Sequence, residues 1–348
     1  MNQSLLNLAR QRGNPVIDGE KATFLWEGQS APSLIDDLHG WDANPQPFKR
    51  LARGMYACSF DLPADSYLEY SLLDPRTKVR IPDPLNRRRI WNGINAYNHF
   101  FYMPDAGPTP LVRRTRGADR GTVTRHRVEA QGMVLGSKRD VYLYKPPTDA
   151  PVPLLVVFDG PDYLRRGKLS AIVDNLIAQE RIHPLAMALI QNGGLGRMVE
   201  YACSETTLAF IVAGVIPLAS REMNILDIEK HPGAYGLLGA SMGGLISVYT
   251  ALRLPQIFGR ALSQAGAFTL WEHETIAMQM VRHMPRPPVK LWLDCGRMDF
   301  LRDSNLSMQA LLRESGYDMI YFENGGAHNF TTWRDCVWRG LETLFGQS

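Results

Sequence analysis

A serine set among small residues stands out in the stretch YGLLGASMGGL, residues 235–245. A short apolar run precedes Ser241, and the apolar spacing of the residues after it predicts a helix. A serine on a sharp turn between a strand and a helix needs small neighbours, because its backbone is strained and the two elements nearly touch. Gly239 and Gly243 supply that room. The stretch therefore indicates a nucleophile turn; a tight strand–helix turn without chemistry is the alternative.

The same turn brings a backbone N–H to the start of the predicted helix. This group belongs to Met242 and lies at the positive end of the helix dipole, where a developing oxyanion can be held. A second donor is expected from the loop DGPDY, residues 159–163, in which Pro161 has no N–H to give. The other N–H groups of that loop belong to Gly160, Asp162 and Tyr163. From these we choose the N–H of Asp162 as the second donor.

Length and composition describe an ordinary globular protein. The 348 residues are 45% hydrophobic and 21% charged, which is enough chain for two domains. A formal net charge of only +3 gives no reason to expect nucleic acid or membrane as a partner. No apolar run reaches the length of a membrane span, and the N-terminus lacks a signal-peptide pattern. We expect a cytoplasmic protein that acts on a small molecule, with a homodimer as one option for its assembly.

Cysteines and histidines give no sign of a metal site. No C-x-x-C pair occurs, and no histidine stands at metal-ligand spacing from a cysteine. Thiols placed far apart are typical of a reducing compartment. We expect no disulfide, no metal and no cofactor. The four cysteines are Cys58, Cys203, Cys295 and Cys336.

The first hundred residues predict a small all-β domain. Residues 1–14 have the pattern of a short amphipathic helix, and turn-forming clusters separate the strand-like runs that follow. These runs are 22–26, 54–61 and 67–73. Short strands at this spacing are typical of an antiparallel sandwich. We predict an immunoglobulin-like β-sandwich over residues 1–104 and a linker rich in Pro, Gly and Arg over 105–121.

From residue 122 the pattern changes to strands that alternate with helices. A hairpin is expected at 124–130 and 139–145, and the apolar run 154–158 is typical of a strand buried on both faces. Further strand-like runs are 185–190, 237–241, 260–264, 289–293 and 319–322. Such alternation indicates a mostly parallel sheet covered on both sides. We predict an α/β-hydrolase domain over 122–348, with its chemistry beyond the carboxyl ends of the strands.

Three histidines follow Ser241, as the chain order nucleophile, acid, base requires. His273 and His283 lie in a polar connection bounded by prolines, where a surface or lid position is the simpler interpretation. His328 lies in the segment GGAHNF, just after the strand-like run 319–322. A glycine-rich loop at the carboxyl end of a strand lets a base reach a serine hydroxyl. We therefore predict His328 as the base.

The acid that orients this imidazole is expected after the strand near 289–293. Asp294 ends that strand directly and can bond to the local backbone. Asp303 precedes Ser304 at the start of a predicted helix, where a capping role is natural. Asp299 lies on the loop beyond the strand end, and we predict it as the acid.

The catalytic half resembles the esterase D branch of the α/β-hydrolases, in particular the enterochelin (ferric enterobactin) esterases. The segments that carry the resemblance are VFDG at 157–160, RMVE at 197–200, GASMGG at 239–244 with FG at 258–259 and SQAGAF at 263–268, and GGAH at 325–328 with Trp333. The β-rich module, which ends in DPLN at 83–86, also resembles the N-terminal domain of those enzymes.

This resemblance implies ester hydrolysis through Ser241, His328 and Asp299, without a cofactor. It also makes Arg197 and Trp333 candidate substrate contacts. We expect a serine esterase with an acyl-enzyme mechanism, whose substrate is a siderophore lactone, an aryl or feruloyl ester or another small ester, with Met242 and Asp162 as oxyanion donors. The alternatives are an acyltransferase of the same branch and a non-catalytic protein that binds a carbohydrate or another ligand.

Overall fold

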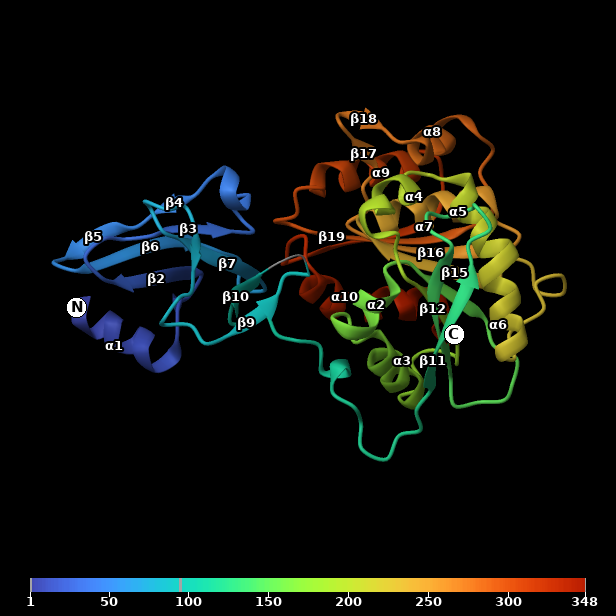
Figure 1. The fold of residues 1–348 in the computed structure, drawn as a ribbon, viewed down its shortest axis with the longest axis horizontal. Coiled ribbons are helices and arrows are strands. Elements are labelled where there is room, and N and C mark those ends of the chain that lie inside the picture. Colours follow the sequence, from blue (N-terminus) through green and yellow to red (C-terminus); the bar gives the residue numbers. More distant parts are fainter. Residues whose placement is uncertain (1, 94–95, 348) are drawn as a thin grey trace. The chain divides into compact units, whose positions relative to one another are not determined.

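Antiparallel sheets form the first part of the chain in the computed structural model, which describes residues 2–93 and 96–347 (Figure 1). The helix α1 (Asn2–Arg12) comes first and ends at Gly13, whose φ of 88° suits a glycine. Met1, the first residue of the predicted helix, lies outside the described residues. The strands are β1 (Val16–Asp18), β2 (Lys21–Glu27), β3 (Ser33–Asp36), β4 (Gln46–Pro47), β5 (Lys49–Ala52), β6 (Met55–Asp61), β7 (Tyr67–Leu73), β8 (Arg80–Ile81), β9 (Arg89–Trp91) and β10 (Tyr97–Tyr102).

These strands pair in two sheets that share an apolar core. One sheet has the order β1-β2-β6-β5, and the other has β4-β3-β7-β10-β9 with β8 paired to β7. Phe24 of β2 meets Tyr70 of β7 and Phe101 of β10 edge to face, with ring centroids 4.8 and 5.6 Å apart. Such aromatic pairs each add about 1 kcal/mol to what burial provides. The first part is thus rich in β-structure; an immunoglobulin-like topology stays a prediction.

An eight-stranded sheet forms the centre of the second part of the chain. Its order is β11-β12-β14-β13-β15-β16-β19-β20. The hairpin of β11 and β12 joins β14 by antiparallel pairing, whereas the next four pairings, from β14 to β19, are parallel. The sheet, predicted to be mostly parallel, is therefore mixed. The strands are β11 (Thr122–Glu129), β12 (Lys138–Lys145), β13 (Leu154–Val157), β14 (Ala186–Ile190), β15 (Tyr235–Ala240), β16 (Phe258–Gln264), β19 (Lys290–Gly296) and β20 (Asp318–Asn324).

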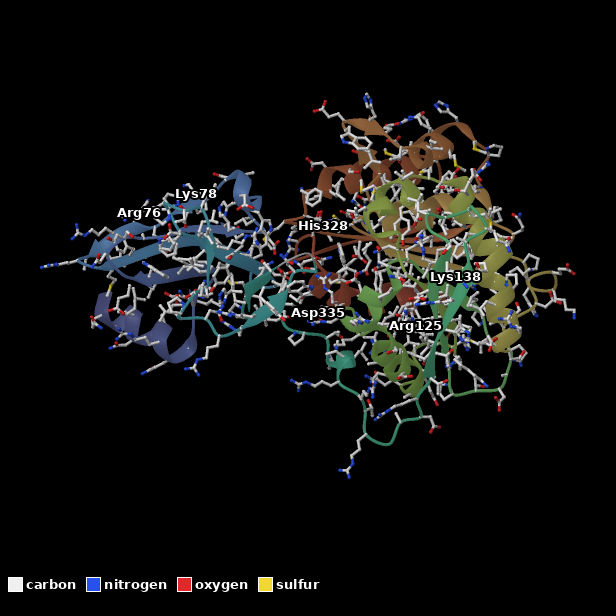
Figure 2. All side chains as sticks on the ribbon, in the orientation of Figure 1. Arg76, Lys78, Arg125, Lys138, His328 and Asp335 are labelled. Carbon is white, nitrogen blue, oxygen red and sulfur yellow. The ribbon has the colours of Figure 1, made fainter. Side chains whose placement is uncertain are left out.

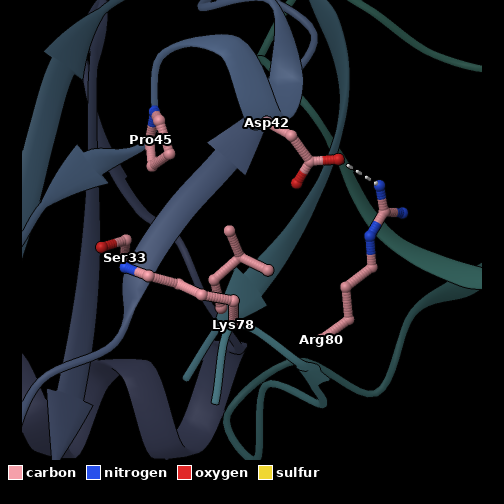
Figure 3. A pocket seen from close by; sticks show the side chains of 6 residues that line it. Ser33, Asp42, Pro45, Lys78 and Arg80 are labelled. Atoms are coloured by element: carbon pink, nitrogen blue, oxygen red, sulfur yellow. Dashed lines mark hydrogen bonds and ion pairs between the residues drawn. The ribbon is translucent and has the colours of Figure 1, made fainter. Parts of the chain in front are cut away.

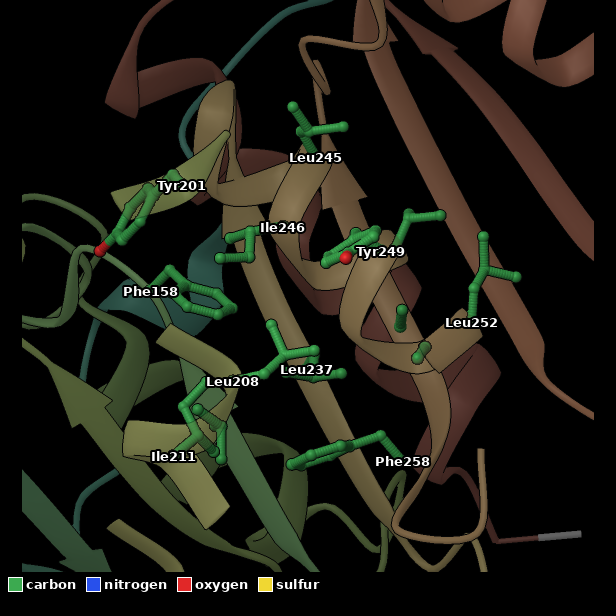
Figure 4. Packing of buried hydrophobic residues seen from close by; sticks show 14 of the residues in the cluster. Phe158, Tyr201, Leu208, Ile211, Leu237, Leu245, Ile246, Tyr249, Leu252 and Phe258 are labelled. Carbon is green, nitrogen blue, oxygen red and sulfur yellow. The ribbon is translucent and has the colours of Figure 1, made fainter. Parts of the chain in front are cut away.

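One face of this sheet packs on a group of helices that includes α7 (Met242–Arg253). Alternate strand residues, such as Leu237 and Leu291, share a buried apolar core with Leu245 of α7. Figure 4 shows Leu245 and Tyr249 of this helix beside the strand that carries Leu237. The other helices that contribute to this core are α4 (Arg197–Tyr201), α5 (Glu205–Phe210), α6 (Ile216–Glu222), α8 (Ile276–His283) and α9 (Arg302–Glu314).

The opposite face carries α3 (Leu169–Ala178) and α10 (Phe330–Phe345). The Tyr144 hydroxyl of β12 donates to Asp174 of α3 at 2.7 Å. Gly236 of β15 makes room for α10, because a Cβ there would lie 2.6 Å from the ring of Phe345. Helices therefore cover both faces, as the alternation of strands and helices predicted.

Strained residues mark the carboxyl ends of three neighbouring parallel strands. Asp159 follows β13, Ser241 follows β15 and Ala265 follows β16, with φ values of 53°, 59° and 46°. Such a conformation costs on the order of 1–3 kcal/mol for a residue with a side chain, and it persists only where the surrounding structure enforces it. The strand ends predicted to carry the chemistry thus include three residues in a conformation that side chains disfavour.

The polar stretch between β16 and β19 holds more structure than the sequence analysis predicted. A short hairpin, β17 (Thr269–Leu270) with β18 (His273–Glu274), is followed by α8. The helix buries Ala277, Met278, Met280 and Val281. The prolines that suggested an irregular connection come after the helix has ended, so they do not interrupt it.

Among the described residues, no single helix has the length and apolar character needed to cross a membrane. One bent pair, Gly194–Tyr201 with Glu205–Glu222, meets the criteria of length and composition when its halves are taken together, with 102° between them. The buried helices of globular proteins meet the same criteria. Part of this pair, the π-helical turn Ile211–Val215, contributes Ile211 and Val215 to the core of the sheet.

We expect the substitution Gly239→Ala to lower the free energy of unfolding by about 1–3 kcal/mol, because the added methyl forces β15 and α7 apart. A Cβ at this position would lie 2.8 Å from the Cα of Gly243 and overlap its carbonyl group. Urea denaturation measures the effect. Gly107→Ala is the matched control, since its methyl group meets nothing within 4 Å. Equal midpoints for both variants would contradict the prediction.

Candidate active site

Ser241 lies where β15 gives way to α7. Its φ and ψ are 59° and −123°, outside the regions that residues with side chains favour. Its N–H donates to the carbonyl of Gln264 at 2.9 Å, and its own carbonyl accepts from the N–H groups of Leu245 at 3.0 Å and Ala267 at 3.1 Å. These bonds hold the turn to the neighbouring strand end and to the helix. The side chain of the predicted nucleophile is partly exposed.

Small residues line this turn on several sides. A Cβ at Gly243 would lie 3.2 Å from the carboxylate of Asp159, and one at Gly244 would lie 2.5 Å from the Ser263 hydroxyl. Larger side chains would push α7 away from the strands. The glycines flanking the serine therefore provide the close approach that the sequence pattern required.

Two backbone N–H groups at the ends of the paired strands β13 and β15 have no acceptor within the part of the chain that the structure describes. One belongs to Met242, the first residue of α7, and the other to Gly160, the first residue of α2 (Gly160–Arg165). The N–H of Asp162, predicted as the second donor, donates to the Asp159 carbonyl at 3.0 Å, and that of Tyr163 to the same oxygen at 3.1 Å. Of the three loop candidates, only Gly160 has an N–H not already used among the described residues.

Arg197 and Asp159 form a buried ion pair at the same strand ends. Nε and Nη2 of Arg197 donate to the two carboxylate oxygens of Asp159, each at 2.7 Å, and the Asn192 amide donates at 2.7 Å. The guanidinium also donates to the Ala240 carbonyl at 3.3 Å and lies 5.1 Å from the centre of the Tyr201 ring. Burial, the largest single effect, lowers the pKa of Arg197, but bonding to Asp159 outweighs it and raises the pKa. Arg197 therefore stays charged.

This network gives Arg197 a structural role besides the substrate contact predicted for it. The guanidinium ties the loop after β13 to the end of β15, and these two segments carry the N–H groups of Gly160 and Met242. Only 25% of the side chain is exposed. Asp159 is not among the residues predicted from the sequence, although its position directly after a buried strand was a usable signal.

His328 and Asp299 form a hydrogen-bonded pair; His328 is labelled in Figure 2. Nδ1 of the imidazole lies 3.0 and 2.9 Å from the two carboxylate oxygens of Asp299, whose side chain is fully buried. The ring of Phe300 packs on the imidazole, with centroids 4.4 Å apart. A carboxylate bound at Nδ1 fixes the tautomer in which Nε2 accepts a proton. The pair thus has the arrangement of a base with its orienting acid.

Backbone bonds join the two loops that carry this pair. The N–H of Met298 donates to the Gly326 carbonyl at 3.1 Å, and that of Arg297 donates to the Asn324 carbonyl at 2.9 Å. A Cβ at Gly296 would overlap the Gly326 carbonyl, so a glycine is needed there. The loop that carries Asp299 and the loop that carries His328 therefore form one structural element.

These loops, 296–300 and 324–332, belong to the compact unit that contains residues up to 107. Asn329, next to His328, is held on two sides. Its Oδ1 accepts the N–H of Thr332 at 2.9 Å as a cap on α10, and its Nδ2 donates to the carboxylate of Asp37 at 3.2 Å. Two further contacts lie within this unit. The N–H of Tyr67 donates to the Gly325 carbonyl at 3.0 Å, and Arg297 forms an ion pair with Asp65.

The structure thus brings the predicted site residues together in two groups. Ser241, Met242 and Arg197 lie in one compact unit, and Asp299 and His328 lie in the other. Trp333, the second predicted substrate contact, is only 6% exposed and has little surface to offer a ligand.

The other candidate acids and histidines from the sequence either bond to nearby residues or lie within a helix or strand. Asp294 is buried and accepts from Trp292 Nε1 at 2.9 Å and from Gln264 Nε2 at 3.3 Å. Asp303 lies inside the first turn of α9, whose N-cap is Leu301, so it does not hold the capping position predicted for it. His273 is in β18, and His283 ends α8. Among the described residues, no group of three or more His, Cys, Asp or Glu side chains could hold a metal ion.

A polar cavity of about 460 Å³ opens among residues of the first part of the chain (Figure 3). Arg80 donates to Asp42 at 3.3 Å beside it and lies 5.2 Å from the centre of the Trp41 ring. No histidine is found among the described residues that line it, so the cavity has no serine–histidine pair. The lining residues are Ser33, Asp42, Pro45, Leu73, Lys78 and Arg80.

Comparison with known proteins gives a family match over most of the second part of the chain. The model of the Esterase family matches residues 132–342. An iron(III) enterobactin esterase of Dickeya dadantii is 29% identical over 290 residues, 76% of this chain and 65% of that protein. An endo-1,4-beta-xylanase/feruloyl esterase of Xylanibacter ruminicola is 26% identical over 185 residues, 52% of this chain and 24% of that protein. The chain therefore spans less than two thirds of the length of either relative.

Solved structures share the fold along nearly the whole chain. The ferric enterobactin esterase of Salmonella typhimurium superposes with a TM-score of 0.80 at 20% identity, covering 97% of this chain and 98% of that one. The enterobactin esterase of Shigella flexneri, solved in the presence of 2,3-di-hydroxy-N-benzoyl-serine, gives 0.77 at 18% identity and covers 97% of each chain. At these identities the likeness shows the fold alone.

We expect Arg197→Met to lower the free energy of unfolding by about 3 kcal/mol, because it leaves the buried carboxylate of Asp159 without its cation. The double variant Arg197→Met/Asp159→Asn should recover part of this loss, since the uncompensated charge is then absent. Urea denaturation tests both. Arg221→Met removes an exposed pair with Glu222 and should have almost no effect. A double variant less stable than the single one would refute the explanation.

Asp37 should make the protein less stable as the pH rises. Burial, together with the nearby charge of Glu69, raises the pKa of Asp37 well above its ordinary value of 3.8. The folded state therefore holds a proton that the unfolded state has lost, and stability falls as the pH rises from about 4 towards the raised pKa. Compared by urea denaturation across that range, Asp37→Asn should lose less stability than the wild type.

The control for this experiment is Asp74→Asn. Hydrogen bonds from the Thr77 and Arg76 N–H groups lower the pKa of the exposed Asp74 carboxyl, so its contribution to stability grows as the pH rises through its ordinary value and has the opposite sign. The same pH dependence in both variants would contradict the assignment to Asp37.

Proposed function

Because the chain belongs to the Esterase family, we propose that it hydrolyses carboxylic esters through an acyl-enzyme on Ser241. The observation that carries the proposal is the strained turn at Ser241, with the unpaired N–H of Met242 beside it among the described residues. The His328–Asp299 pair supplies a base with a fixed tautomer. The enterobactin and feruloyl esterases to which the chain is similar support an ester as its substrate.

In the proposed mechanism, Oγ of Ser241 attacks the ester carbonyl carbon while Nε2 of His328 takes the hydroxyl proton. Asp299 at Nδ1 stabilises the imidazolium that forms. The tetrahedral intermediate collapses as the alcohol leaves with the proton from His328, and the acyl group stays on the serine. A water molecule, deprotonated by His328, then attacks the acyl carbon and releases the carboxylic acid and the free serine.

The oxyanion of the tetrahedral intermediate needs at least one preorganised donor, and we assign the N–H of Met242 to this role. The sequence predicts Asp162 as the second donor. Gly160 has the stronger support, because its N–H has no acceptor among the described residues whereas that of Asp162 is bonded to Asp159. The Arg197–Asp159 pair supports both donors by fixing the ends of their strands.

Among esters, an aryl or other small ester fits this site better than a ferric siderophore lactone. An iron complex of three catecholates is strongly anionic and needs cations for its recognition. The cation predicted to contact the substrate, Arg197, is neutralised by two hydrogen bonds to Asp159. Its positive charge is therefore already balanced by Asp159 and is not available to an anionic substrate.

We expect Ser241→Ala and His328→Ala each to lower the kcat for p-nitrophenyl acetate by on the order of 10⁴ to 10⁶, and Asp299→Asn to lower it less. The serine and histidine take part directly in bond making, whereas the aspartate acts through the imidazole. Release of p-nitrophenolate, followed by its absorbance, measures the effect, and a fluorophosphonate probe should label the wild type but not Ser241→Ala.

Ser263→Ala is the matched control, since Ser263 is a fully buried serine on the neighbouring strand β16. It should retain turnover and labelling. Folded wild-type protein that neither turns over the ester nor reacts with the probe would rule out the esterase mechanism.

A further inference from the structure

The backbone around His328 forms a three-residue turn with this residue at its centre. The N–H of Asn329 donates to the Ala327 carbonyl at 2.9 Å, which closes the turn. On the other flank, the N–H of Ala327 donates to the Thr332 hydroxyl at 3.3 Å. The direction in which the imidazole leaves the backbone is therefore set by Ala327 and Asn329, the residues on either side of His328.

The side chain of Asn329 bonds in two directions, and the residue is only 8% exposed. Its Oδ1 accepts the N–H of Thr332, three residues further along the same segment. Its Nδ2 donates to the carboxylate of Asp37, which comes 292 residues earlier, and has no other acceptor in the part of the chain that the structure describes. The bond to Asp37 thus ties the turn to a distant segment of the same compact unit.

Asp37 is itself held in place by the β-rich part of the chain. It directly follows β3, and its N–H donates to the Glu69 carbonyl of β7 at 3.2 Å. Glu69 in turn donates its N–H to Oδ2 of Asp37 at 2.8 Å, and Trp41 Nε1 donates to Oδ1 at 3.0 Å. Both carboxyl oxygens therefore have fixed positions, and Oδ2 is a preorganised acceptor for the Asn329 amide.

A second bond from the β-rich part meets the turn from the other side. Tyr67, at the start of β7, donates its N–H to the Gly325 carbonyl at 3.0 Å, three residues before His328. Asp37 bonds to the residue that follows His328. The two bonds flank the imidazole, so removing the later one frees the side of the turn that Asn329 occupies.

We propose that Asp37 is a positioning residue for the base: it holds the turn at His328 through the side chain of Asn329. The inference rests on the proposed esterase function and adds to it a residue from the N-terminal module. In this role Asp37 takes no proton from the serine or the substrate, since it acts only through Asn329. A general base must lie within hydrogen-bond reach of the proton it takes, and a displacement of about 1 Å can cost on the order of 10² in rate.

Asn329→Ser provides the test, because a serine is too short to reach Asp37 but still offers an oxygen that can cap α10. We expect kcat for p-nitrophenyl acetate to fall about tenfold while KM stays the same, since the base is displaced and the groups that bind the substrate are unchanged. Initial rates of p-nitrophenolate release give both constants, and circular dichroism establishes that the variant is folded. An unchanged kcat in folded Asn329→Ser would overturn the proposal.

Asp37→Ala breaks the same bond from its other end. Because both substitutions remove one shared interaction, the double variant Asp37→Ala/Asn329→Ser should lose no more kcat than the more impaired single variant. Losses that multiply in the double variant would mean that the two residues act separately, and would overturn the proposal. If Asp37→Ala does not fold, the kcat of Asn329→Ser decides alone.

Asn86→Ser is the matched control, because it makes the same exchange at a buried position of the same compact unit. Asn86 donates to the Tyr70 hydroxyl at 3.0 Å and to the Phe100 carbonyl at 3.1 Å, and within the described residues it bonds to none of 324–332. Its kcat per folded molecule should stay unchanged. A loss equal to that of Asn329→Ser would show that any weakening of the unit lowers activity, and would overturn the proposal.

Amide hydrogen exchange separates this inference from the esterase function. Followed by mass spectrometry in the peptide that spans residues 324–332, exchange should be faster in Asn329→Ser than in the wild type or in Asn86→Ser. If the wild type does not hydrolyse the ester but exchange is faster in Asn329→Ser, the esterase proposal fails while the hold of Asp37 on the turn stands. If the ester is hydrolysed but Asn329→Ser matches the wild type in both exchange and kcat, the role of Asp37 fails alone.

Discussion

The contact between Gly239 and Gly243 sets how closely α7 approaches β15, and the conformation of the turn at Ser241 depends on it. Since no side chain separates the two elements, the chain must reverse within one residue, and Ser241 takes a backbone conformation that its side chain disfavours. The helix then begins at once, which leaves the N–H of Met242 without an acceptor among the described residues. A strained serine and an unpaired donor thus follow from one steric requirement.

Two buried carboxylates at strand ends differ in function because their partners differ. Asp159 is paired with a guanidinium that keeps its charge, so the pair is permanent and holds backbone segments in place. Asp299 is paired with the imidazole of His328, whose Nδ1 it binds. The first pair is suited to fixing the donors of the proposed oxyanion site, and the second to moving a proton. Partner chemistry, rather than burial, distinguishes the pair that fixes backbone segments from the pair proposed to react.

Local patterns in the sequence predicted elements whose partners lie nearby in the chain. The hairpin at 124–130 and 139–145, the buried strand at 154–158 and the helix after Ser241 are all present. The mixed character of the sheet was not predicted, because the antiparallel pairing of β12 with β14 joins segments that an intervening strand separates in sequence. The bond between Asp159 and Arg197 spans 38 residues, and no short pattern registers it. Pairing of Asp299 with His328 was accessible because strand ends and loop composition are local features.

The acid and base loops belong to the same compact unit as the β-rich first part of the chain. Asp37, Asp65 and Tyr67 all contact residues of these loops, which follow some 230 to 290 residues later. The loops that carry Asp299 and His328 are therefore tied to the β-rich first part of the chain. Recombination that replaces this module with one from a related gene would separate the loop that carries His328 from the residues that adapted to it. Selection must act on the two segments jointly, so substitutions in the loop and in the module are expected to be inherited in matched sets.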